Sequence, residues 1–155
     1  MTTAMCPGSF DPPTSGHLDL IDRSRAMFDR VIVAVIDNPS KHPMFTAAER
    51  AELFRSIYGD TVQVTTFSGL LVEHARQQGA DLVVKGVRNS TDLEYETPMA
   101  HMNRHMTGME TVFLPTSPEV GFISSSLVKE IARLGGSVAG LVPDLVENAL
   151  KERLQ

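Results

Sequence analysis

Residues 7–17 form the segment whose residue types and spacing most clearly suggest chemistry. Two glycines and three prolines make it a stiff loop that leads into a helical pattern, and it matches neither the dinucleotide-binding nor the P-loop glycine motif. Backbone N–H groups of such a loop can bind phosphate, and Gly16 lets a ligand approach the backbone closely. His17, in the first helical turn, can direct an imidazole N–H at a phosphoryl oxygen. A Thr14-capped helix whose histidine merely bonds the loop explains these residues equally well.

Three basic residues follow predicted strands, where ligands of an open parallel sheet bind. Lys41 comes after the apolar run 31–36, and Lys85 and Arg88 come after the run 82–84. Lys85, attached to an apolar strand and followed by glycine, favours a phosphate-binding role. Taken alone, Lys41 is also typical of a solvated loop and Arg88 of a surface ion pair. These cations could meet a polyanionic ligand locally.

Three consecutive serines, residues 124–126, precede an apolar helical pattern that begins at Leu127. Their hydroxyls and the N–H groups of the helix start could converge on a triphosphate. Simple N-capping needs only one serine and leaves the other two unexplained.

Two other patterns suggest no ligand site. His101 and His105 have the i, i+4 spacing of a zinc pair, but the accompanying glutamate and a third ligand are missing, so we expect no protein metal site. Four methionines approximate a helical stripe that suits the core or a subunit interface, and they are Met99, Met102, Met106 and Met109.

The elements that must position these residues alternate along the chain. Apolar runs rich in β-branched residues predict five strands, at residues 4–6, 31–36, 62–66, 82–84 and 111–114. Helical patterns cover residues 16–28, 47–58, 70–78, 92–106, 127–134 and 143–154. Capping boxes at Thr46 and Thr91, and Pro143 in a first turn, mark three helix starts. This order predicts an α/β fold, a single Rossmann-like domain over residues 1–155 with a central parallel five-stranded sheet flanked by helices and a C-terminal helical segment.

Composition narrows the class of protein. The chain has 155 residues and a net charge of −5, which leaves no broad basic surface for nucleic acid. A single cysteine, Cys6, and a start without a basic, apolar leader favour a cytoplasmic protein. No apolar run approaches the ~20 residues of a membrane span.

Several segments also resemble a known family. Residues 8–17 resemble the [HT]-x-G-H signature of the nucleotidylyltransferase superfamily. The further segments that resemble the phosphopantetheine adenylyltransferase family are Asn38-Pro39-Ser40-Lys41-His42-Pro43-Met44-Phe45, Val84-Lys85-Gly86-Val87-Arg88, Leu93-Glu94-Tyr95-Glu96, Met102-Asn103-Arg104-His105 and Phe122-Ile123-Ser124-Ser125-Ser126-Leu127-Val128-Lys129-Glu130. They run in order over nearly the whole chain.

The resemblance implies direct in-line transfer of the adenylyl group of ATP to 4′-phosphopantetheine, giving dephospho-coenzyme A and pyrophosphate. It further implies Mg²⁺ held mainly through the ATP phosphates, coenzyme A as a feedback inhibitor, and a homohexamer. It makes His17 catalytic and assigns the acceptor to Ser9, Lys41, Leu71 and Lys85. The ATP site that it implies comprises Ser9, Phe10, His17, Gly86, Val87, Arg88, Glu96, Val120, Gly121, Phe122, Ile123, Ser124, Ser125 and Ser126.

The sequence departs from the family pattern at Val120-Gly121, where an aromatic and a small polar residue are expected. Three alternatives stay open. One is another small nucleotidylyltransferase acting on nicotinamide mononucleotide or glycerol phosphate, which the contexts of Lys41 and Lys85 disfavour. A class I synthetase would need more tRNA-binding mass and a K-M-S-K-S-like loop. A nucleotide-binding regulatory protein would not need an acceptor-phosphate clamp.

Overall fold

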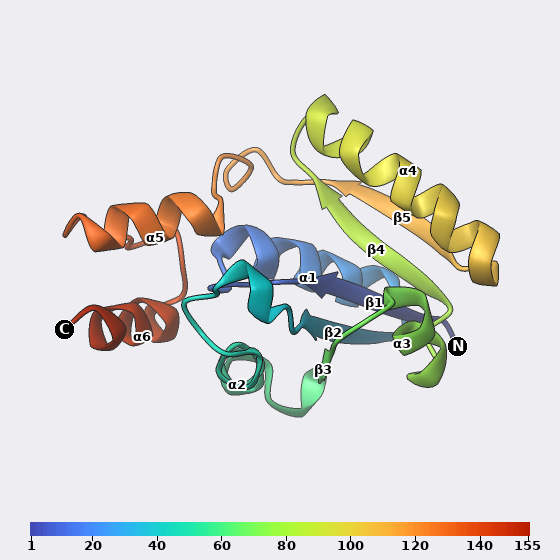
Figure 1. The fold of residues 1–155 in the computed structure, drawn as a ribbon, viewed down its shortest axis with the longest axis horizontal. Helices are drawn as coiled ribbons and strands as arrows, with labels where there is room; N and C mark the ends of the chain where they lie inside the picture. The colour runs from blue at the N-terminus through green and yellow to red at the C-terminus, as the bar shows by residue number, and fades with distance from the viewer.

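The computed structural model describes all 155 residues and centres on a five-stranded, fully parallel sheet with the order β3-β2-β1-β4-β5 (Figure 1). The strands are β1 (Thr3–Gly8), β2 (Arg30–Ile36), β3 (Gln63–Phe67), β4 (Leu82–Val87) and β5 (Glu110–Pro115). From β1 the chain winds outward to β3, then returns to the other side of β1 for β4 and β5. The predicted α/β class and parallel five-stranded sheet are confirmed.

Six α-helices connect and follow the strands, all within a few residues of their predicted bounds. They are α1 (Ser15–Met27), α2 (Ala47–Tyr58), α3 (Leu71–Gln77), α4 (Ser90–Thr107), α5 (Ser125–Arg133) and α6 (Asp144–Leu154). Short 3₁₀ helices, which the sequence patterns did not predict, cover Pro39–Lys41 and Gly59–Thr61. The pair α5 and α6 lies at the end of the molecule opposite the N-terminus (Figure 1).

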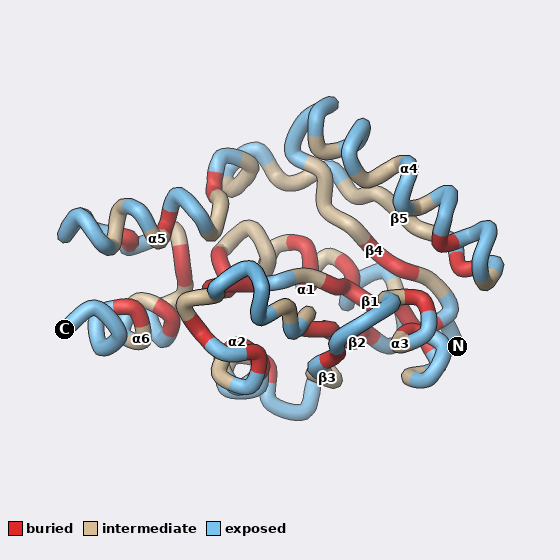
Figure 2. Tube along the Cα trace, in the orientation of Figure 1, coloured by how far each residue is buried: buried red, intermediate tan, exposed pale blue.

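The two faces of the sheet carry separate parts of the core because successive strand residues point to opposite faces. Cys6 packs in a cluster with side chains of α1 and α2, whereas its neighbour Met5 packs in a second cluster with side chains of α3. A third cluster joins Phe45 to the apolar faces of α5 and α6. Buried residues accordingly concentrate in the central strands and on the helix faces turned toward other elements (Figure 2).

The seam between β1 and β4 is paired over only part of its length. These strands pair at Ala4 with Leu82 and at Met5 with Val83, and no further. By contrast, β1 pairs with β2 as far as Gly8, and β4 pairs with β5 as far as Val87. The carboxyl ends of β1 and β4 therefore diverge at the point where the strand order reverses, which is where ligands bind in open α/β sheets.

Three local expectations need correction. β1 continues through Pro7 and Gly8, and β4 continues past Lys85 to Val87, so neither strand ends where its apolar run ends. The capping box at Thr46 is confirmed, but the one expected at Thr91 is wrong. Helix α4 begins two residues earlier than expected, because the side chain of Asn89 accepts a hydrogen bond from the Asp92 N–H and caps it. Pro143 is the N-cap of α6 rather than a residue of its first turn.

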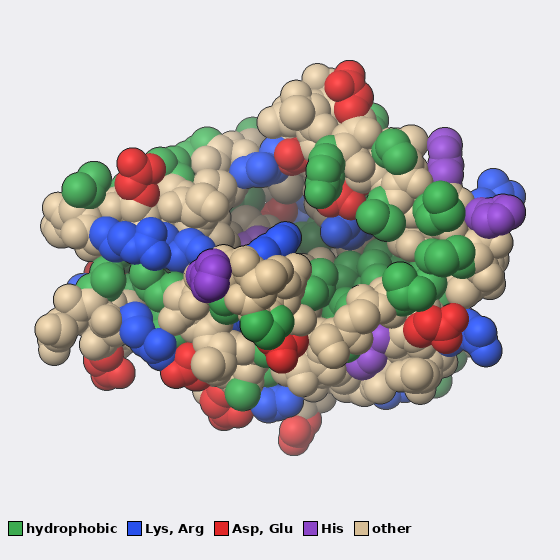
Figure 3. Space-filling view, in the orientation of Figure 1, with side chains coloured by type: hydrophobic (Ala, Val, Ile, Leu, Met, Phe, Trp, Pro, Cys, Tyr) green, Lys and Arg blue, Asp and Glu red, His purple; other side chains and the backbone are tan.

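The methionine stripe is divided between the surface and the core. Met99, Met102 and Met106 are exposed on α4, whereas Met109 lies beyond the helix and is buried in the second cluster. The space-filling view shows hydrophobic side chains gathered over α4 and a hollow between α4 and α5 with Lys and Arg side chains near its rim (Figure 3). None of the helices combines the length and apolar character needed to cross a membrane.

Candidate active site

Two adjoining cavities open at the carboxyl ends of the strands. The first, of about 520 Å³, lies where β1 and β4 diverge and is bounded by α4 and the segment before α5. The second, of about 480 Å³, lies among the β1–α1 loop, the segment after β2 and the start of α5. Phe10, His17 and Ser125 line both cavities. Any two ligands that occupy the cavities would therefore meet at these three residues.

His17 is oriented by the cap of its own helix. Thr14 Oγ1 accepts from the His17 backbone N–H at 3.4 Å, and the Thr14 N–H donates to His17 Nδ1 at 3.0 Å. Because Nδ1 is an acceptor, the ring proton of the neutral imidazole lies on Nε2. The helix-cap interpretation and the phosphate-donor interpretation are thus compatible: the cap fixes the tautomer that leaves an N–H donor for a ligand.

The imidazole is uncharged at neutral pH. Burial of the ring among protein atoms lowers the pKa of His17 to about 4, and the positive charge of Arg88 contributes to the lowering. His17 therefore suits a hydrogen-bond donor to a phosphoryl oxygen better than a general acid that transfers a proton.

The cations that face the first cavity are paired with carboxylates from α4. Lys85 Nζ lies 3.3 Å from Glu96 Oε1, and each side chain is 23% exposed. Arg88 Nε lies 3.0 Å from Asp92 Oδ2, a contact that raises the pKa of Arg88 and lowers that of Asp92. Arg88 is thus both an ion-pair residue and a cavity residue.

The three serines have three different environments. Ser124 caps α5 by accepting from the Leu127 N–H at 3.1 Å. Ser125 Oγ donates to Pro12 O at 2.8 Å and so joins α5 to the β1–α1 loop. Ser126 makes neither contact; it is exposed and lines the second cavity. Capping therefore explains one serine, as expected, and the other two are available to the cavities.

Most of the predicted site residues come together here. The first cavity is lined by Phe10, His17, Lys85, Gly86, Arg88, Glu96, Val120, Ile123, Ser124 and Ser125. The second is lined by Ser9, Phe10, His17, Lys41, Ser125 and Ser126. Lys41 and Lys85, predicted to bind one acceptor phosphate, line different cavities that adjoin at Phe10, His17 and Ser125.

Four predicted site residues lie outside both cavities. Leu71 is partly buried against the second core cluster, and Phe122 is exposed. Val87 and Gly121 line neither cavity. The glycine of the Val120-Gly121 departure has a local reason, because a Cβ at position 121 would lie 3.3 Å from Thr116 Oγ1. The backbone of Gly121 is too close to Thr116 for a larger residue to enter without displacement.

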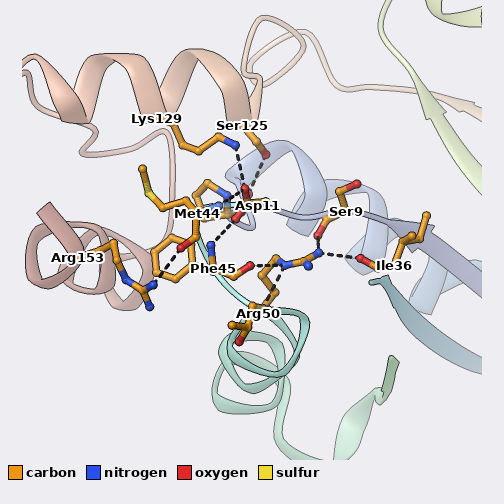
Figure 4. Close-up of polar contacts among 11 residues, drawn as sticks. Ser9, Asp11, Ile36, Met44, Phe45, Arg50, Ser125, Lys129 and Arg153 are labelled. Atoms are coloured by element: carbon orange, nitrogen blue, oxygen red, sulfur yellow. Dashed lines mark hydrogen bonds and ion pairs between the residues drawn. The ribbon is translucent and has the colours of Figure 1, made fainter. Parts of the chain in front are cut away.

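Sequence reasoning missed a set of buried polar contacts at the wall of the second cavity (Figure 4). Asp11 accepts from the Met44 and Phe45 N–H groups at 2.8 and 2.9 Å and pairs with Lys129 Nζ at 2.9 Å. Burial alone raises the pKa of Asp11, but these hydrogen bonds outweigh it and hold the pKa below its usual value. Arg50, also buried, donates only to backbone carbonyls.

Arg50 carried a detectable signal in the sequence. It lies on the same face of α2 as Ala47, Ala51 and Phe54, so a charged residue interrupts an apolar stripe. The pairing of Asp11 with Lys129 had no comparable local signal, because the two residues are 118 positions apart.

No group of three or more His, Cys, Asp or Glu side chains is arranged to hold a metal ion. The carboxylates that line the two cavities, Asp11, Asp92 and Glu96, are each paired with a cation. The donor set therefore fits a metal that arrives with a nucleotide rather than one bound by the protein alone.

Comparisons with known proteins show which sequences and folds this chain is similar to. Residues 5–131 match a family model described as cytidylyltransferase-like. A phosphopantetheine adenylyltransferase of Nocardioides sp. is 51% identical over 156 residues, which cover 99% of this chain and 98% of that protein. One of Streptomyces coelicolor is 50% identical over 158 residues, covering 100% of this chain and 99% of that protein. The crystal structure of a lipopolysaccharide core biosynthesis protein from Thermoplasma volcanium, 18% identical, shares the fold with a TM-score of 0.57 over 76% of this chain and 97% of that one.

Proposed function

The chain belongs to the phosphopantetheine adenylyltransferase family, and on this premise we propose that it transfers the adenylyl group of ATP to 4′-phosphopantetheine. The products are dephospho-coenzyme A and pyrophosphate. The observation that carries the proposal is about 50% identity over nearly the full length of such enzymes. The position of His17 at the junction of two cavities supports it, because a transfer reaction requires two substrates to meet.

The two cavities divide the substrates. The nucleotide occupies the first cavity, where Gly86, Arg88 and Val120 line the wall and α5 presents its capped N-terminus. The phosphate of the acceptor lies toward the second cavity, beside Ser9 and Lys41. Lys85 reaches the same phosphate from the first cavity, so the two lysines offset the repulsion between two anionic substrates.

The transfer needs no base and no covalent enzyme intermediate. An oxygen of the acceptor phosphate is already anionic; it forms a bond to the α-phosphorus as the bond from that phosphorus to the bridging oxygen of pyrophosphate breaks. His17 Nε2–H donates to an α-phosphate oxygen, and this hydrogen bond strengthens as negative charge gathers there in the transition state. Alignment of the two phosphates supplies the remaining acceleration.

Mg²⁺ belongs to the proposal as an ion that enters on the ATP phosphates. It supplies charge neutralisation on the triphosphate, while the orienting contacts come from the side chains of the two cavities. Chelation should stop turnover and leave the melting temperature of the nucleotide-free protein unchanged. Tight, stoichiometric metal in nucleotide-free protein would contradict this part.

Assembly, feedback and location complete the proposal. The exposed methionines of α4, Met99, Met102 and Met106, are the candidate surface for a homohexamer, because exposed apolar patches of this kind mark interaction sites. Coenzyme A contains the skeleton of the product and is therefore the expected feedback inhibitor. The cytoplasm, which supplies ATP, is the expected location.

The decisive experiment measures pyrophosphate release from ATP with three acceptor conditions: 4′-phosphopantetheine, nicotinamide mononucleotide, or none. Release should require 4′-phosphopantetheine, and mass spectrometry should identify dephospho-coenzyme A as the second product. Equal or faster release with nicotinamide mononucleotide would assign another acceptor. Release without any acceptor would show that the chain hydrolyses ATP.

A further inference from the structure

Phe10, at the junction of the two cavities, has a backbone conformation that non-glycine residues rarely adopt. Its φ is 51°, in the left-handed region. Its ring is buried with an edge-to-face contact to the His17 imidazole, the ring centroids 4.9 Å apart, and a similar contact to Phe54 on α2. Gly8 provides the space, because a Cβ there would lie 2.9 Å from Phe10 Cζ. The ring of Phe10 is thus wedged between the core and His17.

Arg50 holds the peptide group that determines this conformation. The φ angle of Phe10 describes its rotation relative to the preceding peptide plane, which carries the Ser9 carbonyl. Arg50 Nη1 donates to this carbonyl and also to Ile36 O, the latter at 2.9 Å (Figure 4). The guanidinium therefore ties the strained peptide to the end of β2.

The other end of the same guanidinium fixes the start of α2. Arg50 Nε donates to Phe45 O at 3.0 Å and to Thr46 O at 3.3 Å. Arg50 is only 1% exposed and forms no ion pair. Its permanently charged guanidinium is therefore buried with backbone carbonyls as its only hydrogen-bond acceptors. A lysine would offer one compact donor group and could not hold the same set of carbonyls in a planar arrangement.

We propose that Arg50 is a positioning residue for the transfer reaction: by fixing the Ser9–Phe10 peptide it keeps the Phe10 ring against His17 and holds the imidazole at the junction of the cavities. The proposal rests on the proposed function, in which His17 contacts the α-phosphate. A purely structural role would lower stability and leave the ring of His17 as it is. A positioning role changes both the ring and the turnover number.

The test compares Arg50→Lys with the wild type in kinetics and in the ¹⁵N NMR spectrum of the His17 ring. We expect kcat to fall about ten- to a hundredfold, with the KM for ATP within about threefold, because the lost contacts align a group that acts in the transition state. The ring nitrogens of His17, which in the wild type should show protonated Nε2 and unprotonated Nδ1, should shift toward a mixture of tautomers. Arg55→Lys is the matched control, since Arg55 lies on the same helix in an exposed pair with Glu52, and it should change neither readout.

A second variant keeps the proposal testable if Arg50→Lys folds poorly. Phe10→Leu retains an apolar side chain but removes the edge-to-face contact, and it should disturb the His17 spectrum in the same way. If Arg50 acts through Phe10, the losses of kcat in the two variants should not multiply in the double variant. Unchanged His17 signals in both single variants, or fully multiplicative losses, would overturn the proposal. The proposed function fails separately, if pyrophosphate release by the wild type does not require 4′-phosphopantetheine.

Discussion

The two cavities differ in how their charged side chains are held. In the first, Lys85 and Arg88 pair with Glu96 and Asp92 across a partly exposed surface. In the second, Asp11 and Arg50 line the cavity, but both are buried and bonded largely to the backbone. Exposed ion pairs are weak and exchange partners readily. Removing one member of a buried set of polar contacts instead leaves its buried partners without a hydrogen bond or a counter-charge.

This difference indicates two ways to prepare a site for phosphate. The first cavity has its cations neutralised by carboxylates, so under the proposed function binding there is an exchange of partners. The second cavity has its loops fixed before any ligand arrives, which reduces the ordering cost of binding. His17, which lines both, has its orientation fixed by Thr14 and Phe10 on the loop that the second set supports.

The largest expected effect is at the residue that the cavities share. His17→Ala should lower kcat by about 10²–10³, because the hydrogen bond it removes matters chiefly in the transition state. The dissociation constant of ATP should stay within several-fold of the wild-type value. Calorimetry for ATP and steady-state kinetics at saturation check both statements. Collapse of ATP affinity with kcat nearly intact would instead make His17 a ground-state binding residue.

The next effect separates the two lysines. Lys41→Ala and Lys85→Ala should each raise the KM for 4′-phosphopantetheine by about ten- to a hundredfold and the KM for ATP less, since each removes a charged hydrogen bond. Lys85→Ala should have the larger effect because it leaves Glu96 unpaired beside the phosphate.

A double variant tests that difference between the lysines. Adding Glu96→Gln should partly restore the acceptor KM of Lys85→Ala and do little for Lys41→Ala. Equal values for the two lysine variants, with no rescue by Glu96→Gln, would show that the ion pair has no influence on the acceptor. An unchanged acceptor KM in both single variants would reject the two-lysine arrangement.

The buried contacts of Asp11 should contribute to the free energy of unfolding and to its pH dependence. Asp11→Asn should lower the free energy of unfolding at pH 7 by roughly 1–3 kcal/mol, because Lys129 and two backbone N–H groups lose a charged acceptor. The pKa of Asp11 is lowered in the folded state, so its contribution is complete above the unfolded value of about 4 and is lost as the pH falls through the folded value.

Urea unfolding at several pH values measures this effect. The difference between the wild type and Asp11→Asn should be full at pH 7 and shrink below about pH 4. Asp60→Asn, at an exposed position, is the control and should change stability little at any pH. A difference that stays constant into acid would mean that the ionised form of Asp11 is not what stabilises the fold.

The smallest effect belongs to the exposed pair of the first cavity. Asp92→Asn should lower the KM for ATP by about two- to threefold, because Arg88 no longer has to leave a charged partner, and exposed pairs contribute only about 0.2–1 kcal/mol. The change should diminish as salt is added, since screening weakens the pair in the wild type. An ATP KM that rises would show that Asp92 orients Arg88 rather than competing for it.

The fold was predictable because it depends on local patterns. The β-branched run of β2 and the Thr46 capping box depend on neighbouring residues, and both elements are found as expected. Most site residues were predictable for a related reason: the segments after parallel strands converge at one edge of the sheet. The resemblance to a family supplied the roles that spacing alone left open.

What could not be predicted depends on contacts between distant segments. The pairing of Lys85 with Glu96 requires the position of α4 over the end of β4. The cap of α4 lies at Asn89, two residues before the expected Thr91. Leu71 was assigned through the family and lies in the core-facing part of α3, outside both cavities. Its role in binding stays a prediction.

The short pairing between β1 and β4 also has a mechanical consequence. The sheet consists of two plates, β3-β2-β1 and β4-β5, joined along a seam that holds at Ala4–Leu82 and Met5–Val83 alone. Separation along this seam disrupts fewer paired positions than separation along any other, so we expect the sheet to yield most easily between β1 and β4. A ligand that contacts the ends of both β1 and β4 would hold these two strands together at the end where they are not paired. The sheet should therefore be stiffer in the complex than in the free protein.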